Sequence, residues 1–110
     1  MMEIALLITF LQQNVKRFEK EKKNKTHFLS ELKYYVLGSI LISKKPNDVD
    51  IIIVYNRENT PIYDLLEFRK VLRQQFLKKH SLPLDIILIS SLEEKSLNYI
   101  EKEKARRIEL

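Results

Sequence analysis

Four consecutive aliphatic residues, Ile51 to Val54, place the strongest constraint on how this chain can fold. A strand with one face in water alternates apolar and polar side chains, whereas an unbroken aliphatic run is typical of a strand that is buried on both faces. A second aliphatic run covers Leu84–Ile89. We therefore expect strands at Asp48–Tyr55 and Leu84–Ile89, in a β-sheet that is covered by helices.

Two segments beside these runs have helical periodicity. Their apolar residues recur three or four positions apart, which is the spacing of an amphipathic helix. The first helix is expected near the N-terminus, where Leu6 and Phe10 widen the apolar face, so that this face either packs on the sheet or also docks a partner or a second copy. The second is expected to start with Thr60 as the N-cap and Pro61 as the first helical residue, and to end near Lys79. The two apolar stripes are Ile4, Leu7, Ile8, Leu11, Val15 and Phe18, and then Ile62, Leu65, Phe68, Leu72 and Phe76.

Two shorter patterns complete the expected order of elements. Residues 34–37 are aromatic and aliphatic and predict another strand. Ser91 and Glu94 match a Ser-x-x-Glu capping box that would open a last helix, with Leu92, Leu97 and Ile100 facing inward. The order α-β-β-α-β-α predicts an α/β (α+β) fold, in which a small mixed β-sheet is flanked by helices.

The 110 residues are expected to form one domain. Its parts would be an N-terminal helix and basic loop at 1–25, a core at 32–100 and a charged tail at 102–110. Because the tail is rich in charged residues, we expect it to fray.

The only glycine in the chain, Gly38, lies directly before Ser39. Average usage would give about seven or eight glycines in a chain of this length. A single glycine therefore marks a position that needs either a positive φ or a close approach of the backbone to a ligand, since a Cβ atom obstructs both.

Asp48 and Asp50 lie one residue apart at the start of the strand predicted at 48–55. Alternate residues of a strand point to the same face, so these two carboxylates would project side by side. Carboxylates held that close repel each other unless a cation lies between them, and their oxygen ligands suit Mg²⁺ or Mn²⁺. The pair predicts a metal site.

This pattern resembles the signature of the nucleotidyltransferase fold of the DNA polymerase beta superfamily, and of its minimal nucleotidyltransferases in particular. In that family a strand ends in Gly-Ser, a short helical turn follows, the next strand opens with Asp-x-Asp, and a third carboxylate lies on a later strand. Here Gly38-Ser39 and Asn47-Asp48-Val49-Asp50 match the first two features, and Asp85, near the head of the second aliphatic run, is the candidate third carboxylate. The resemblance covers about 32–100.

The resemblance implies an enzyme. Asp48, Asp50 and Asp85 would be catalytic and would bind Mg²⁺ or Mn²⁺, while Gly38 and Ser39 would contact the phosphates of ATP or another nucleoside triphosphate. A nucleoside monophosphate, by preference AMP, would move to a hydroxyl group on a partner protein or on RNA. The family also implies a partner, either a small helical toxin for which this chain would be the antitoxin or a second copy that completes the pocket.

The sequence departs from the family at two places. Many small members have an arginine directly after Gly-Ser and a second glycine a few residues later, where this chain has Ile40 and residues such as Ser43. Lys44 or Lys45 would have to supply the missing positive charge. The departure favours an alternative, in which the same fold is catalytically weak or inactive and binds and regulates a partner protein.

The net charge of +5 favours polyanionic ligands, including nucleoside triphosphates and RNA. The basic run Lys16–Lys25 is interpreted as a solvated helix end, with nonspecific RNA binding as the alternative. Arg69, Lys70 and Arg73 are expected to be solvated as well. The chain has no cysteine, which excludes a zinc–thiolate site, and its apolar start is too short to span a bilayer, so we expect a cytoplasmic protein without a membrane partner.

Overall fold

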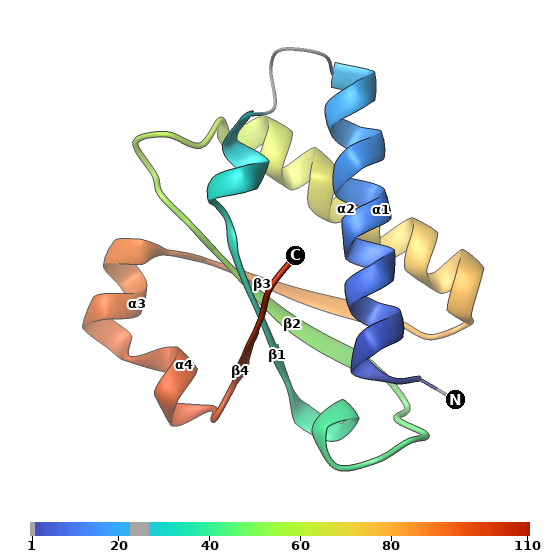
Figure 1. Ribbon diagram of the computed structural model, residues 1–110. Coiled ribbons are helices and arrows are strands. Elements are labelled where there is room, and N and C mark those ends of the chain that lie inside the picture. The colour runs from blue at the N-terminus through green and yellow to red at the C-terminus, as the bar shows by residue number, and fades with distance from the viewer. Residues whose placement is uncertain (1, 23–26) are drawn as a thin grey trace.

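The computed structural model describes residues 2–22 and 27–110 (Figure 1). Its two long helices are α1 (Ile4–Lys22) and α2 (Ile62–His80). The strands are β1 (Lys33–Leu37), β2 (Val49–Tyr55), β3 (Leu84–Ser90) and β4 (Arg106–Ile108). The short helical segments are η2 (His27–Glu31), η3 (Gly38–Leu41), α3 (Ser91–Leu97) and α4 (Tyr99–Lys102).

The strands form one mixed sheet in the order β3-β2-β1-β4. β2 and β3 are parallel, whereas β1 is antiparallel to both β2 and β4. The parallel pair is joined through α2, which is the kind of crossover that parallel neighbours require. The predicted fold class, a small mixed sheet with helices, is confirmed.

β2 is buried on both faces, as its aliphatic run predicted. Ile51 and Ile53 belong to the core shared with α1 and α2, and Ile52 and Val54 belong to a smaller core that includes side chains of α4. Figure 1 shows the two long helices on one side of the sheet and the two short helices on the other. Helix residues of the larger core include Leu7, Phe10, Leu11, Phe18, Leu65, Phe68, Leu72 and Phe76.

The wide apolar face of α1 is used mainly within the fold. The ring of Phe10 packs edge-on against that of Phe76, with the two centroids 5.0 Å apart. Leu6 alone of the two widening residues remains on the surface, with 44% of its area exposed. The basic run that begins at Lys16 is helical as far as Lys22, and its residues 23–25 lie outside the described residues.

The expectation of a frayed C-terminal tail was wrong. Residues 106–108 form β4, whose backbone pairs with β1, and Tyr34 lies opposite Ile108. Ile108 is only 5% exposed and belongs to the larger core. β4 is held in place by the burial of one aliphatic side chain and by backbone pairing with β1, although its other two residues are charged.

The expected capping box was one residue out of register. Ser90, not Ser91, is the N-cap of α3: its hydroxyl accepts from the Glu93 N–H, and the Glu93 carboxylate accepts from the Ser90 N–H. Leu92 and Leu97 are 62% and 51% exposed, so the inward orientation expected for them was also wrong.

The expected last helix is divided in two at Asn98. This residue has a left-handed backbone with φ of 51°, and α4 begins directly after it. The carboxylate of Glu94 accepts hydrogen bonds from the N–H groups of Tyr99 and Ile100 and thereby satisfies donors that begin α4. Ile100 packs against the smaller core, as expected.

The start of α2 also differs by one residue from the expectation. Pro61 occupies the N-cap position, without a side-chain capping bond, and Thr60 lies before it. The helix ends at His80, where Ser81 takes the left-handed conformation and donates its N–H to the Leu77 carbonyl. No helix within residues 2–22 and 27–110 has both the length and the apolar character that crossing a membrane requires.

Candidate metal centre

Three aspartates meet where strands β2 and β3 begin. Asp48 lies just before β2, Asp50 is its second residue, and Asp85 is the second residue of β3. Because the two strands are parallel and in register, Asp50 lies directly beside Asp85. On the other side of Asp50 the paired residue is Leu37, the last residue of β1. The sheet therefore brings together residues that are 35 positions apart in the sequence.

The geometry of the three carboxylates fits one divalent cation. Each aspartate offers one oxygen, and these oxygens all lie within 4.8 Å of one another. Ligands of Mg²⁺ at about 2.1 Å are roughly 3–4 Å apart, so small side-chain rotations would bring the three oxygens onto one ion. Asp48 and Asp50 are half-buried and Asp85 is exposed, which leaves the site open on one side. The donor set consists of hard oxygen ligands, which suit Mg²⁺ or Mn²⁺.

Gly38 is required by the position of Asp50. Its φ is +82°, in the region that L side chains rarely adopt, and a Cβ atom at this position would lie only 2.9 Å from the Oδ2 atom of Asp50. The sequence predicted either a positive φ or a close approach of the backbone to a ligand, and the structure has the positive φ together with a close approach. The group that approaches is the carboxylate of the candidate site itself. The single glycine thus leaves room for Asp50.

Electrostatics make the cluster unfavourable without a cation. Partial burial raises the pKa of Asp50, and the negative charges of Asp48 and Asp85 and a hydrogen bond with Asp85 raise this pKa further. Each of these effects penalises an ionised Asp50. A bound divalent cation would remove the penalty, which is the behaviour expected of a metal ligand.

Ser39 lies beside this cluster within η3, a 3₁₀ helix of four residues. The backbone carbonyl of Ser39 accepts hydrogen bonds from the N–H groups of Ile42 and Ser43, which closes the turn. Ser39 itself is half-buried. A short helical turn was expected after Gly-Ser, at residues 40–45, whereas η3 begins at Gly38 and ends at Leu41, so the turn includes the Gly-Ser pair itself.

The two lysines expected to replace a missing arginine follow this turn and are both exposed. Lys45 lines a pocket of about 370 Å³ together with Lys79 and His80, and none of the three aspartates lines that pocket. The structure gives Lys45 an environment separate from the carboxylates.

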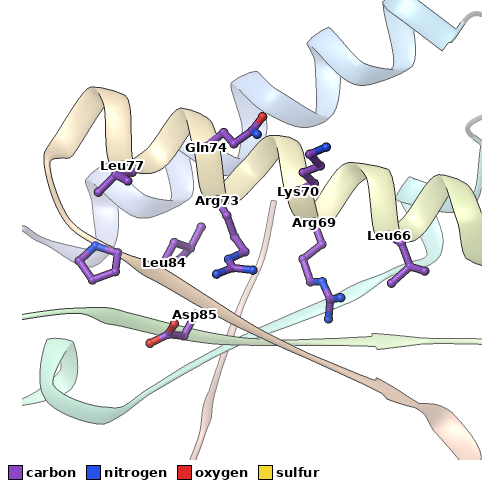
Figure 2. Close-up of a pocket in the computed structure, with 9 residues that line it drawn as sticks. Leu66, Arg69, Lys70, Arg73, Gln74, Leu77, Leu84 and Asp85 are labelled. Carbon is purple, nitrogen blue, oxygen red and sulfur yellow. The ribbon is translucent and has the colours of Figure 1, made fainter.

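A larger pocket of about 470 Å³ lies between α2 and the start of β3, and Asp85 is one of its lining residues. Arg69, Lys70 and Arg73 line it from the helix. Figure 2 shows the guanidinium groups of Arg69 and Arg73 extending from α2 toward the strands, whereas Lys70 points to the other side of the helix. The sequence indicated only solvated side chains here. Their spacing along α2 carries no sign that β3 and Asp85 lie beside them.

Comparison of the chain with protein-family models, with curated proteins and with solved structures gave no match.

Proposed function

We propose that this chain is a Mg²⁺-dependent nucleotidyltransferase, in keeping with its resemblance to the minimal nucleotidyltransferases of the DNA polymerase beta superfamily. One observation carries the proposal. The oxygens of Asp48, Asp50 and Asp85 lie within 4.8 Å of one another. They do so beside a lone glycine that has no room for a Cβ atom.

Asp48, Asp50 and Asp85 would hold Mg²⁺ or Mn²⁺, which when bound neutralises phosphate charge and lowers the pKa of a nearby hydroxyl group. Gly38 would keep the backbone clear of the carboxylates and of the nucleotide phosphates. Ser39 would donate its hydroxyl hydrogen to a phosphate oxygen. These roles follow the family resemblance and agree with the positions of the five residues around the same end of the sheet.

The reaction would transfer a nucleoside monophosphate, by preference AMP from ATP, to a hydroxyl group. The acceptor oxygen forms a bond with the α-phosphorus, and the bond from that phosphorus to the oxygen bridging it to the β-phosphate breaks. Pyrophosphate leaves with the bonding electrons. The hydroxyl proton would pass to Asp85, which is the exposed member of the three carboxylates.

The acceptor would be a hydroxyl group on a partner protein or on RNA. The resemblance makes a small helical toxin the proposed protein partner, with this chain as its antitoxin, and a second copy of this chain is the proposed means of enlarging the nucleotide pocket.

The direct test is incubation with α-³²P-ATP and Mg²⁺, with and without the product of the neighbouring reading frame. The matched variant is Asp48→Asn with Asp50→Asn, which keeps the size of both side chains. Label that appears on protein or RNA with the wild type and not with the variant supports the transferase and identifies the acceptor class. Equal labelling by both proteins contradicts it.

A regulatory module without strong catalysis is the second candidate, and one observation favours it. Leu92 and Leu97 of α3 are more than half exposed, although they are large apolar side chains. Such residues are suited to contact with a protein partner. Capture of the partner that survives Asp48→Asn with Asp50→Asn, together with an absence of label in the wild type, would favour this candidate.

A further inference from the structure

The outer edge of β3 is open. β3 is the last strand on its side of the sheet, and among the described residues its backbone pairs only with β2. An edge strand directs a row of unpaired N–H and C=O groups outward. The pairing with β2 is regular through all seven residues of β3, so no bulge turns this edge away. Residues 86–88 are half-buried, whereas Ile52 on the neighbouring strand has no exposed area.

The opposite edge of the sheet is protected against pairing. β4 has only three residues, and its Arg106 and Arg107 are exposed. Short, charged edge strands are a common means of preventing unwanted pairing. β3 has seven residues, five of them aliphatic, and its one charged residue, Asp85, lies near its start. The contrast indicates that the edge of β3 is suited to pairing with another segment.

The flank of α2 that faces this edge is cationic. α1 packs along a different flank of α2, where Lys22 forms an ion pair with Glu67. Arg69 and Arg73 line the pocket of about 470 Å³ between α2 and the start of β3. Within residues 2–22 and 27–110, neither arginine has an ion pair or a side-chain hydrogen bond. The two guanidinium groups are therefore available to an anionic partner.

The same flank of α2 has apolar side chains at its two ends. Leu66 and Leu77 line the pocket and are 38% and 55% exposed. Figure 2 shows one of them on each side of the two arginines along α2. From Arg69 to Arg73 the helix rises about 6 Å, and successive side chains on one face of a strand are about 6.6 Å apart. A strand added beside β3 would therefore present consecutive same-face side chains to the two arginines.

Asp50 and Asp85 project from the face of the sheet away from α2. Leu84 and Ile86 pack on the α2 side, in the larger core. Asp85, which borders the pocket, alternates with them along β3 and so points with Asp50 to the other face. Ile87 shares that face and packs against the smaller core. An added strand would meet cations on the α2 side and an aliphatic side chain on the other side.

We propose that the outer edge of β3 binds an extended segment of a partner protein as an additional strand, and that this segment has acidic side chains at alternate positions, on the α2 side. Main-chain hydrogen bonds along the edge supply affinity, and Arg69 and Arg73 supply the preference for acidic residues. The inference goes beyond the proposed function, because it needs neither a bound metal nor nucleotidyl transfer.

A second copy of this chain fits the edge less well than an acidic segment does. Two β3 strands paired antiparallel about a two-fold axis place both α2 helices on the same face of the joined sheet, side by side. Arg69 and Arg73 of one copy would then face those of the other, and like charges placed together across an interface repel. Charge complementarity therefore favours an acidic partner.

The test is binding of an octapeptide of alternating valine and glutamate, labelled with fluorescein and followed by fluorescence anisotropy in EDTA. A peptide with glutamine in place of glutamate has the same shape without the charge and should bind more weakly. The variant is Arg69→Gln with Arg73→Gln, and its matched control is Lys16→Gln with Arg17→Gln, which removes the same charge from exposed positions of α1. We expect the first variant to bind about fivefold more weakly than the wild type, as the loss of two partly exposed ion pairs implies, and the control to be unchanged.

Hydrogen–deuterium exchange tests the mode of binding. If the peptide adds to the sheet, amide exchange in residues 84–90 slows when it binds, because outward N–H groups gain partners. Arg73 is exposed, so Arg73→Glu tests the specificity without risk to the core. This variant should weaken binding of the valine–glutamate peptide and strengthen binding of an alternating valine–lysine peptide.

Five results would overturn the inference. The first two are the absence of binding to the valine–glutamate peptide and equal weakening by the two double variants. Binding without slower exchange in residues 84–90 would place the peptide on α2 alone. Slower exchange there with rising protein concentration and no peptide would identify a second copy as the occupant. Tighter binding of an RNA oligonucleotide than of the peptide, lost in Arg69→Gln with Arg73→Gln, would identify a nucleic acid.

Discussion

The interior of β2 and the start of β2 have the same neighbouring strands but opposite energetic character. In the interior, Ile51, Ile52 and Ile53 have no exposed area, and their burial stabilises the sheet. At the start, Asp50 lies between Leu37 and Asp85, and its pKa is raised by burial and by two nearby negative charges. The comparison shows that the aliphatic part of one strand provides the stability that lets its polar end hold an unfavourable cluster.

The largest effect is expected from the interior. Ile53→Ala should reduce the free energy of unfolding by about 2–5 kcal/mol, because it removes a fully buried side chain and leaves a cavity. Urea denaturation followed by circular dichroism measures it. Ile42→Ala is the control, since Ile42 is 90% exposed and its truncation should change little. Equal losses in the two variants would show that the interior is not the source of stability.

Gly38→Ala should have the next largest effect, and it should change both the stability of the fold and the binding of metal at the start of β2. The left-handed backbone at φ +82° would cost an L side chain about 1–2 kcal/mol, and the new Cβ would displace the carboxylate of Asp50. Weaker Mn²⁺ binding should accompany the loss of stability. With Asp50→Ala present, Gly38→Ala should cost less, because only the backbone term remains. Additive losses would contradict the contact between the two residues.

Asp50→Asn should increase the stability of the metal-free protein near neutral pH by up to about 1 kcal/mol, the size of interactions between partly exposed charges. The folded-state pKa of Asp50 is raised above its ordinary value of 3.8. Just above pH 3.8 the folded wild type therefore binds more protons than the unfolded chain, and its stability falls as the pH rises from 3.8 toward neutral. The gain from Asp50→Asn should therefore disappear below pH 3.8. Thermal unfolding from pH 3 to pH 7 measures it, and a constant difference across that range would contradict the charge repulsion.

The smallest effect is expected at Tyr34, which pairs with Ile53 across β1 and β2. Its hydroxyl is buried without a hydrogen-bond partner among the described residues, and burial raises its pKa. Tyr34→Phe should leave stability unchanged or raise it by a few tenths of a kcal/mol, because an unpaired buried polar group is removed. A loss above about 1 kcal/mol in chemical denaturation would show that the hydroxyl has a partner.

Much of the fold could be predicted from the sequence, because its signals are local. The aliphatic run at Ile51–Val54 predicted a strand buried on both faces. The single glycine before Ser39 predicted either a positive φ or a close approach of the backbone to a ligand, and the first alternative is observed. The order of Asp48, Asp50 and Asp85 along two aliphatic runs placed all three near strand starts. The three aspartates lie together because β2 and β3 are parallel. Parallel neighbours require a long crossover connection, and the helix predicted between these two strands is such a connection.

The features that the sequence did not predict are of two kinds. Some depend on contacts between segments that are distant in the sequence, and others depend on which of two equally suitable residues takes a local role. β4 has only one buried side chain, Ile108, and exists because β1 offers an edge far away in the sequence. Ser90 and Ser91 each have a glutamate three residues later, so the pattern alone fits two registers of the capping box. Tertiary packing decides between them, since Glu94 is bound to the start of α4.

The most direct measurement of the central claim is Mn²⁺ binding followed by electron paramagnetic resonance, for the wild type, Asp50→Asn and the control Glu58→Gln. Glu58 is an exposed acid in the loop after β2, so its substitution removes the same charge away from the cluster. If Asp48, Asp50 and Asp85 form a metal site, the wild type and Glu58→Gln bind Mn²⁺ with equal affinity and Asp50→Asn binds at least tenfold more weakly. Equal affinity for all three proteins would contradict the metal centre and the nucleotidyl transfer proposed from it.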